Sequence, residues 1–278
     1  MESSQRQQVL VSILIPTKNS GPSLSLTLQS LQNQNYKNIE IIVSDSRSTD
    51  CTQNIVRDFG YELSICDGKV LAARIDGIQK AAGDIVILLD SDQQMLSDTI
   101  SRVVDKMYQG YDMIVLEEIP SEMNGIMAKM WQREREIATR DIEMKVEPMD
   151  GAILPRAFRS KLIKEAVTKI PTQITPWVSH PDHQIIYYEC SKISRRTGYM
   201  NRALYYFERT NPLDLIRTYF SHGRDAKRLV RYERYRDLIS SKFMKKTSGY
   251  LTSGLLISSN LLILLKSVSF VMGYVLSK

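Results

Sequence analysis

The sequence predicts an α/β fold in which a mostly parallel β-sheet carries helices on both faces. Three short apolar runs, at 9–16, 39–45 and 84–90, have the length and composition of buried strands. Stretches of helical spacing or composition separate them, and this alternation is typical of a sheet built from βαβ units. A chain of 278 residues, 43% of them hydrophobic, can bury the core that such a fold needs.

The elements of the first ninety residues follow from composition and from the residues that end them. Pro16 stops the first strand, because proline offers no backbone N–H to a neighbouring strand. Leucines at helical spacing come next, and Gly83 closes a later stretch of helical composition. We expect strands at 9–16, 39–45, 61–66 and 84–90. We expect helices at 23–31, from the polar turn 46–50 to about residue 59, and at 69–82.

The pattern continues less regularly up to residue 211. Ser97 suits the N-cap of a helix, and Gly110 follows the end of that helix. Pro171, Pro176 and Pro181 punctuate a loop-rich segment. We expect helices at 97–109, 122–140 and 156–170, strands at 111–118 and 149–154, and a single domain over 1–211.

The C-terminal part divides by charge into a basic segment and an apolar segment. Residues 212–246 have the pattern of basic amphipathic helices, and Lys and Arg strongly outnumber Asp and Glu from 192 to 246. Residues 247–278 are apolar enough for one transmembrane helix, which needs about 20 residues. We expect this segment to associate with a membrane. Because Asn260 and Lys266 dilute it, a buried core helix or an oligomer helix is the alternative.

Charge and cysteine usage also predict a location. The polar residues 1–8 lack the apolar run of a secretory signal. Cys51, Cys66 and Cys190 are odd in number and widely spaced, which favours neither a disulfide framework nor a zinc site. A basic segment beside an apolar one suits the cytoplasmic surface of a membrane. We expect a membrane protein whose catalytic domain lies on the cytoplasmic side.

Two carboxylates one residue apart, Asp90 and Asp92, follow the apolar run 84–90. Like charges this close repel, and a cation between them relieves the repulsion. Hard oxygen ligands suit Mg²⁺ or Mn²⁺, and such ions commonly bridge to the phosphates of a substrate. The pair predicts a metal-dependent site for a phosphorylated substrate, although such a pair by itself is more often a solvated turn.

Other polar residues come directly after predicted strands. Thr17 and Asn19 follow the first strand, and Asp45 ends the second. In parallel sheets, ligands bind beyond the carboxyl ends of the strands. We therefore expect these side chains and Asp92 to share one crevice.

Four blocks of sequence carry a family resemblance. They are VSILIPTKN at 11–19, VSDSRSTD at 43–50, LAARIDGIQKAAGD at 71–84 and LDSD at 89–92. In this order they resemble the family 2 glycosyltransferases of GT-A fold, which use nucleotide-activated sugars. The resemblance implies a GT-A type, Rossmann-like sheet flanked by helices, with C-terminal helices after it.

The resemblance assigns a role to each residue of the donor site. Pro16, Thr17 and Asn19 would line the nucleoside pocket. Asp45 would accept a hydrogen bond from the base, and its alternative is to cap the following turn. Arg74 matches an arginine near the donor diphosphate, where a guanidinium suits phosphate oxygens, and its alternative is a surface salt bridge.

The metal ligands are implied in the same way. Asp90 and Asp92 match the metal motif, with Asp92 the more direct ligand and Asp90 also beside the donor. Gln94 would offer an amide oxygen. The implied cofactor is Mn²⁺ or Mg²⁺, which stabilises the charge that develops on a leaving diphosphate.

The acceptor side depends on a base that takes a proton from a hydroxyl group. The family usually supplies the Asp of a Glu-Asp pair at a helix start, and the matching segment here reads HPDHQ at 180–184. Asp182 is therefore the candidate catalytic base. Because Pro181 departs from the family pattern, His183 is an equal candidate for the base, and the alternative role of Asp182 is to cap a helix.

These inferences predict an inverting glycosyltransferase that moves a sugar, a hexose by class, from a UDP- or GDP-linked donor. The acceptor would be a lipid-linked glycan or a polyprenyl phosphate at the cytoplasmic membrane face. A sugar nucleotidyltransferase is the first alternative, although PTKNSG at 16–21 supplies its Gly-rich, basic loop poorly. The second is a membrane-tethered nucleic-acid-binding protein that uses 192–246, which leaves the aspartates unexplained. We expect no nucleic-acid partner.

Overall fold

The computed structural model describes residues 9–120, 130, 154–206, 211–240 and 257–277. The chain divides into two compact units, and each is described by itself. The first unit comprises Met1–Ile119, Pro155–Val178 and Ile186–Phe207, and the second comprises Pro120–Leu154, Ser179–Ile185 and Glu208–Lys278.

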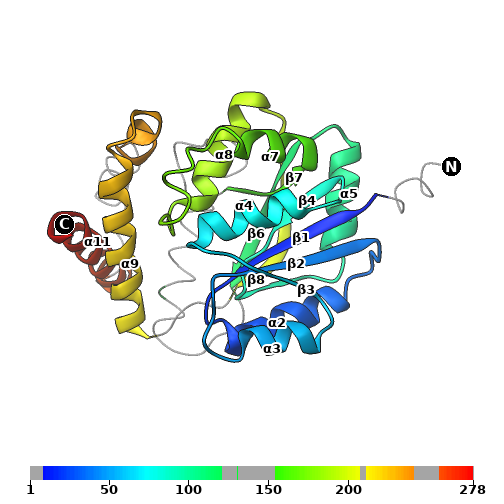
Figure 1. Ribbon diagram of the computed structural model, residues 1–278, viewed down its shortest axis with the longest axis horizontal. Coiled ribbons are helices and arrows are strands. Elements are labelled where there is room, and N and C mark those ends of the chain that lie inside the picture. Colours follow the sequence, from blue (N-terminus) through cyan, green and yellow to red (C-terminus); the bar gives the residue numbers. More distant parts are fainter. Residues whose placement is uncertain (1–8, 121–129, 131–153, 207–210, 241–256, 278) are drawn as a thin grey trace. The chain divides into compact units, whose positions relative to one another are not determined.

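One sheet organises the described part of the first unit (Figure 1). Its eight strands lie in the order β3-β2-β1-β4-β7-β6-β8-β5. Their bounds are β1 Val11–Thr17, β2 Ile39–Asp45, β3 Glu62–Ile65, β4 Ile85–Leu88, β5 Gln93–Met95, β6 Met113–Pro120, β7 Pro155–Arg159 and β8 Thr197–Tyr206.

The sheet is mixed, so the prediction of a mostly parallel sheet holds for its first half. Strands β3, β2, β1 and β4 are parallel neighbours. Beyond β4 the direction reverses, because β7 runs antiparallel to both β4 and β6, and β5 runs antiparallel to β8. The alternation of strand and helix ends at β4, since β5 follows it without a helix between. Only that alternation indicated parallel strands.

Helices cover both faces of the sheet, as predicted. Side chains of α2 (Gly21–Gln32), α3 (Thr52–Asp58) and α5 (Thr99–Tyr108) share a buried cluster with Ile13 and Ile15 of β1. Helix α4 (Val70–Lys80) lies on the opposite face, beside α7 (Ser160–Val167). On α4, a Cβ at Gly77 would lie 3.4 Å from Leu14, whose side chain points away from those of Ile13 and Ile15.

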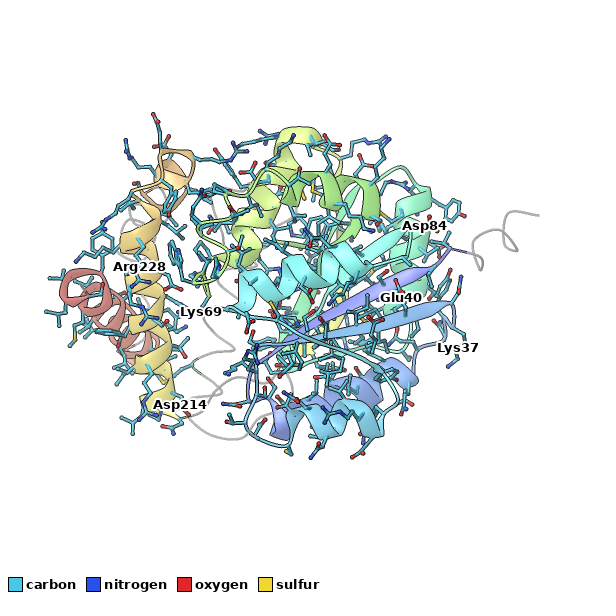
Figure 2. All side chains as sticks on the ribbon, viewed as in Figure 1. Lys37, Glu40, Lys69, Asp84, Asp214 and Arg228 are labelled. Carbon is cyan, nitrogen blue, oxygen red and sulfur yellow. The ribbon has the colours of Figure 1, made fainter. Side chains whose placement is uncertain are left out.

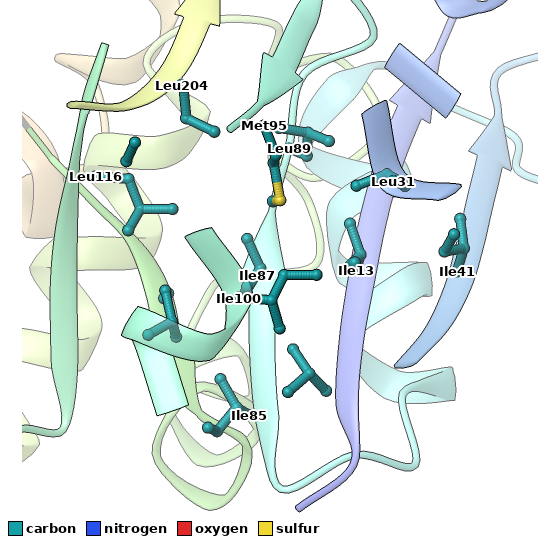
Figure 3. Close-up of a cluster of buried hydrophobic side chains, with 14 of the residues drawn as sticks. Ile13, Leu31, Ile41, Ile85, Ile87, Leu89, Met95, Ile100, Leu116 and Leu204 are labelled. Carbon is teal, nitrogen blue, oxygen red and sulfur yellow. The ribbon is translucent and has the colours of Figure 1, made fainter. Parts of the chain in front are cut away.

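The larger core lies between the sheet and the α2, α3 and α5 layer (Figure 3). It joins alternate residues of the central strands with apolar residues of the helices, as expected for a half-buried sheet face. Its labelled members are Ile13, Leu31, Ile41, Ile85, Ile87, Leu89, Met95, Ile100, Leu116 and Leu204.

Glu40 links β1 to the segment before β4 at the end of the sheet where the parallel strands begin. Its carboxylate accepts hydrogen bonds from the hydroxyl of Ser12 and from the backbone N–H groups of Ala82 and Gly83. A Cβ at Gly83 would lie 2.6 Å from the Ser12 Oγ, so this position needs a residue without a side chain. Figure 2 labels Glu40 and Asp84 at this end of the sheet.

Several expected elements differ from the structure in the second half of the chain. Residues 156–159, predicted as the start of a helix, belong to β7, and α7 begins at Ser160. The segment after Pro171, predicted to be rich in loops, also contains α8 (Asp182–Ile193) and β8. The predicted helix 122–140, apart from Met130, and almost all of the predicted strand 149–154 lie outside the described residues.

Two long helices dominate the described part of the second unit, α9 (Pro212–Leu229) and α11 (Ile257–Leu276). Asn211 caps α9, because its side-chain oxygen accepts a hydrogen bond from the Leu213 N–H at 3.0 Å. The helices pack closely at two glycines. A Cβ at Gly223 would lie 2.0 Å from the Phe270 carbonyl oxygen, and one at Gly273 would lie 2.0 Å from that of Phe220.

The structure does not support the prediction of a transmembrane helix. Among the residues that the structure describes, no helix combines the length and the apolar character needed to cross a membrane. Within α11, the polar residues Lys266, Ser267 and Ser269 interrupt the apolar run.

Candidate functional site

The carboxyl ends of β1, β2 and β4 meet at one edge of the sheet. Thr17, the last residue of β1, pairs in register with Asp45, the last residue of β2. Strand β4 lies on the other side of β1, with Leu88 in register with Leu14. Asp90 follows directly, so the structure brings together residues predicted from three separate strand ends.

The Asp45 carboxylate is completely buried and well bonded. It accepts hydrogen bonds from the Thr17 hydroxyl at 2.8 Å and the Gln53 amide at 2.9 Å. It also accepts bonds from the Ser48 backbone N–H at 2.7 Å and the Ser48 hydroxyl. Burial alone would raise the pKa of Asp45, but these hydrogen bonds, led by Ser48, outweigh it and hold the pKa below its ordinary value. Asp45 therefore carries a stable negative charge and caps the turn after β2.

The loop after β1 is bonded to that same turn. Asn19 adopts a positive φ of 51°, which Asn tolerates better than most residues. Its side-chain oxygen accepts a hydrogen bond from the Thr49 N–H at 2.9 Å, and its own N–H donates to the Ser48 hydroxyl at 2.8 Å. Asp50 accepts a hydrogen bond from the Gly21 N–H at 3.1 Å and so holds the loop in place. Pro16 lies beside Ser44 in the sheet.

Asp90 is held between two arginines. Arg74, which is 2% exposed, extends from α4 and forms an ion pair with the Asp90 Oδ1. Arg156 on β7 approaches the Asp90 Oδ2 at 3.0 Å. In this ion pair the guanidinium is buried, whereas the side chain of Asp90 is 30% exposed.

Glu118 and Gln93 complete this network, and the sequence reasoning identified neither. Arg156 forms an ion pair with Glu118 on β6 and donates from its Nε to the same carboxylate at 2.8 Å. The Gln93 amide donates to Glu118 at 2.9 Å, and its oxygen accepts from the Asp90 N–H at 2.9 Å. Burial alone would lower the pKa of Arg156, but Glu118 and Asp90 raise it above its ordinary value. Arg74, Asp90, Arg156 and Glu118 thus form a chain of alternating charges.

Asp92 and Gln94 follow Asp90 in the sequence, and both are partly exposed. The turn that carries Asp92 is anchored to α2, because the Thr27 hydroxyl donates to the Ser91 carbonyl oxygen at 3.0 Å. Gln94 belongs to β5, where successive side chains point to opposite faces of the sheet. Since Gln93 contacts Asp90 and Glu118, Gln94 faces away from them.

The residues at this edge fit a divalent cation that takes most of its ligands from a substrate. Among the described residues, no group of three or more His, Cys, Asp or Glu side chains could hold a metal ion alone. Asp92 is partly exposed beside the Asp90 network and offers hard oxygen ligands. Mg²⁺ and similar ions are often bound by one or two carboxylates together with substrate phosphates.

Asp182 belongs to the second unit, and the residues predicted to bind the donor belong to the first. It is buried and is the first residue of α8, directly after the cis peptide bond between His180 and Pro181. The His180 ring stacks on that of His222 of α9, with centroids 4.0 Å apart. The Ser179 N–H donates to Asp225 at 2.8 Å. The candidate base thus sits in a segment that is bonded to α9.

Comparison with known proteins supports a sequence relationship over this part of the chain. Residues 12–160, more than half of the chain, match the family described as Glycosyl transferase family 2. The GalNAc(5)-diNAcBac-PP-undecaprenol β-1,3-glucosyltransferase of Campylobacter jejuni is 27% identical over 48% of this chain and 47% of its own length. The UDP-Glc:α-D-GlcNAc-diphosphoundecaprenol β-1,3-glucosyltransferase of Escherichia coli is 31% identical over 39% and 47%. The alignments therefore span less than half the length of these relatives.

Solved structures share the fold. The mannosyltransferase PcManGT of Pyrobaculum calidifontis, in complex with GDP-Man and Mn²⁺, has a TM-score of 0.61 at 15% identity and covers 96% of this chain and 88% of its own. S. aureus TarS 1-349 in complex with UDP has a TM-score of 0.57 at 17% identity, with coverage of 95% and 80%. These likenesses confirm the GT-A type α/β fold, and the match over residues 12–160 shows that the chain belongs to glycosyl transferase family 2.

Proposed function

We propose that this chain transfers a sugar from a nucleoside diphosphate sugar to a lipid-linked acceptor, with inversion at the anomeric carbon. The observation that carries the proposal is the grouping of Thr17, Asp45, Arg74 and Asp90 at the carboxyl edge of the parallel strands. The names of the C. jejuni and E. coli relatives, both transferases to undecaprenol-linked glycans, support the acceptor class. Membership of glycosyl transferase family 2 favours transfer of a sugar over the alternative, which was transfer of a nucleotide by a sugar nucleotidyltransferase.

On the donor side, the chain would bind and orient the nucleotide. The loops after β1 and β2 are bonded to each other through Asn19, Ser48 and Asp45, so they offer a fixed wall for the nucleoside. Arg74 and Arg156 place positive charge beside Asp90, which suits the approach of a diphosphate. A wall that is ordered before the donor arrives lowers the entropic cost of binding.

Asp92 is the residue that we propose holds Mn²⁺ or Mg²⁺. Both oxygens of Asp90 are already bonded to guanidinium groups, which reduces their availability to a cation, and Gln94 faces away from Asp90. When bound, the metal would neutralise the charge that develops on the leaving diphosphate. The arginine pair would hold Asp90, and through it the turn, so that Asp92 keeps one position.

On the acceptor side, Asp182 is proposed to accept the proton of an attacking hydroxyl group, with His183 as the competing candidate. A polyprenyl phosphate acceptor would need no base, because its phosphate oxygen is already an anion. The name of an Aeromonas hydrophila relative, an undecaprenyl-phosphate 4-deoxy-4-formamido-L-arabinose transferase, supports that second acceptor, and the relative is 35% identical over 38% of this chain and 36% of its own length.

The test is a screen of UDP- and GDP-linked sugars with the purified full-length chain, a lipid-linked glycan acceptor and Mn²⁺. One donor is expected to give transfer that a chelator abolishes. Asp92→Ala is expected to lower the rate at least about 100-fold. Asp98→Ala, which removes a more exposed carboxylate shortly after the same turn, is the matched control and should keep the rate. Absence of binding by any nucleotide sugar in the presence of metal would overturn the proposal.

A further inference from the structure

From Lys266 onward, helix α11 buries polar and small residues and exposes apolar ones, whereas Leu262, one turn earlier, is buried with Leu215 of α9. The buried positions from there to the end of the helix are Lys266, Ser269 and Gly273. Gly273 touches the α9 backbone, and the Lys266 ammonium lies 5.5 Å from the centre of the Tyr219 ring of α9. A surface helix of a water-soluble domain normally shows the opposite arrangement, with its apolar face buried.

The outward residues form one continuous face, which we call the α11 stripe. Leu264, Val268, Val271 and Val275 recur at the spacing that places side chains in a row along one side of a helix. Their exposed fractions run from 45% to 62%. Met272 and Leu276 widen the row and are similarly exposed. Large contiguous apolar patches are uncommon on soluble proteins and mark interaction surfaces.

The contact between α9 and α11 is of the kind that helices make in lipid (Figure 1). Glycines let the two backbones approach until a Cβ at Gly223 would lie 2.0 Å from the Phe270 carbonyl oxygen. In lipid, the hydrophobic effect does not drive helices together. Small residues at the contact and polar residues that face the partner helix stabilise such a pair instead. The α11 stripe is then the side that faces the apolar surroundings.

Positive charge accompanies the stripe on the same unit. The Lys227 ammonium of α9 binds the carbonyl oxygens of Val275 at 3.2 Å and Ser277 at 2.5 Å, so a cation lies at the end of the stripe. Along α9 and the segment after it, the exposed basic residues outnumber the acidic ones. They are Arg217, which pairs with Asp214, and Arg228, Arg231, Arg234 and Arg236, against the exposed acids Glu233 and Asp237. A second copy of the chain would bring the same positive charges together, whereas anionic lipid offers the opposite charge.

We propose that the α11 stripe docks into the face of an anionic lipid bilayer, with α9 and α11 lying along the surface. Apolar side chains would enter the boundary between head groups and acyl chains, and the arginines would contact the head groups. This proposal goes beyond the proposed sugar transfer and does not depend on it, because binding to a bilayer needs neither donor nor acceptor.

The experiment is co-sedimentation of the full-length chain with vesicles, without any sugar donor. One set contains equal parts of phosphatidylcholine and phosphatidylglycerol, and the other phosphatidylcholine alone. The wild type is expected to bind the anionic set more tightly, and less tightly as salt rises. Val268→Asn/Val275→Asn is expected to bind roughly tenfold more weakly or worse. The matched control, Leu26→Asn/Ile193→Asn, removes two exposed apolar side chains outside the α11 stripe and should bind like the wild type.

A second variant keeps the test independent of folding defects. The fluorescence of Val271→Trp is expected to shift to shorter wavelength when anionic vesicles are added, because the indole enters an apolar medium. Equal binding by the double variant and the wild type would overturn the proposal. So would equal binding to both vesicle sets, or light scattering that shows the α11 stripe holding two copies together in the absence of lipid.

Discussion

The guanidinium Nη1 of Arg156 lies 3.0 Å from the Oδ2 of Asp90. The same guanidinium binds Glu118, and Arg74 binds the other oxygen of Asp90. The first carboxylate of the Asp-x-Asp pair is therefore fixed from two sides by buried cations. Asp92, the second carboxylate of the pair, is the residue that we propose holds the metal.

Removal of one arginine from this ion-pair network should lower the free energy of unfolding. Arg156→Gln leaves Glu118, whose side chain is 9% exposed, without its ion pair, and such a loss costs about 3 kcal/mol of unfolding free energy. Arg102→Gln breaks the more exposed pair with Asp98 and should cost less than about 1 kcal/mol. Urea unfolding followed by circular dichroism measures both. The network would be unimportant for folding if the two variants unfolded at the same urea concentration.

The stability that Asp45 contributes to the fold should depend on pH. Because its folded-state pKa lies below the ordinary value of 3.8, the carboxylate stabilises the fold above that pH, and the contribution is lost as pH falls through the lowered pKa. Asp45→Asn should therefore cost about 2 kcal/mol at neutral pH and progressively less below about pH 4. Urea unfolding at several pH values gives the difference. Thr17→Val keeps the carboxylate and should retain the acid-dependent loss, and a constant difference for Asp45→Asn down to pH 3 would contradict this account.

The close contact between α9 and α11 should not tolerate a methyl group. Gly→Ala within a helix normally stabilises by up to about 1 kcal/mol, but Gly223→Ala would force its Cβ against the Phe270 backbone and cost about 2 kcal/mol. Gly77→Ala adds the same group in α4, where the nearest atoms lie at 3.4 Å, and should be close to neutral. Thermal unfolding by circular dichroism compares the two. A Gly223→Ala protein as stable as Gly77→Ala would show that the helices can separate freely.

The proposed base can be tested by changing the acceptor. Asp182→Asn is expected to slow transfer to the hydroxyl of a lipid-linked glycan by at least about 100-fold, because the amide cannot take a proton. Transfer to a polyprenyl phosphate should be nearly unchanged. His183→Gln, measured in parallel, distinguishes the two candidates. Unaltered transfer to the glycan by Asp182→Asn would remove this residue from the chemistry.

The meeting of Thr17 and Asp45 at one edge of the sheet could be predicted from the sequence because its signals are local. Each strand end is marked by an apolar run followed by polar residues, and parallel strands bring such ends to one edge. The predicted range 39–45 agrees with β2, and the register then places Thr17 beside Asp45. No long-range information was needed for that part of the site.

The ion-pair network could not be predicted in the same way. Arg156 lay in a segment expected to be helical, and its contacts depend on β7 pairing antiparallel with β4 and β6. Nothing near Glu118 in the sequence indicates that pairing. Gln93 and Gln94 show the same difficulty on a smaller scale, because a shift of one residue in a strand moves a side chain to the other face.

The pairing of β5 with β8 sets a limit on when the site can form during synthesis. Gln93, which contacts both Asp90 and Glu118, lies in register with Tyr206, and the Leu96 N–H donates to the Ala203 carbonyl oxygen at 3.1 Å. A ribosome must therefore deliver β8 before the strand beside the Asp90–Asp92 turn gains its partner. A nascent chain that ends at residue 160 would contain every residue matched to the family and still lack this support.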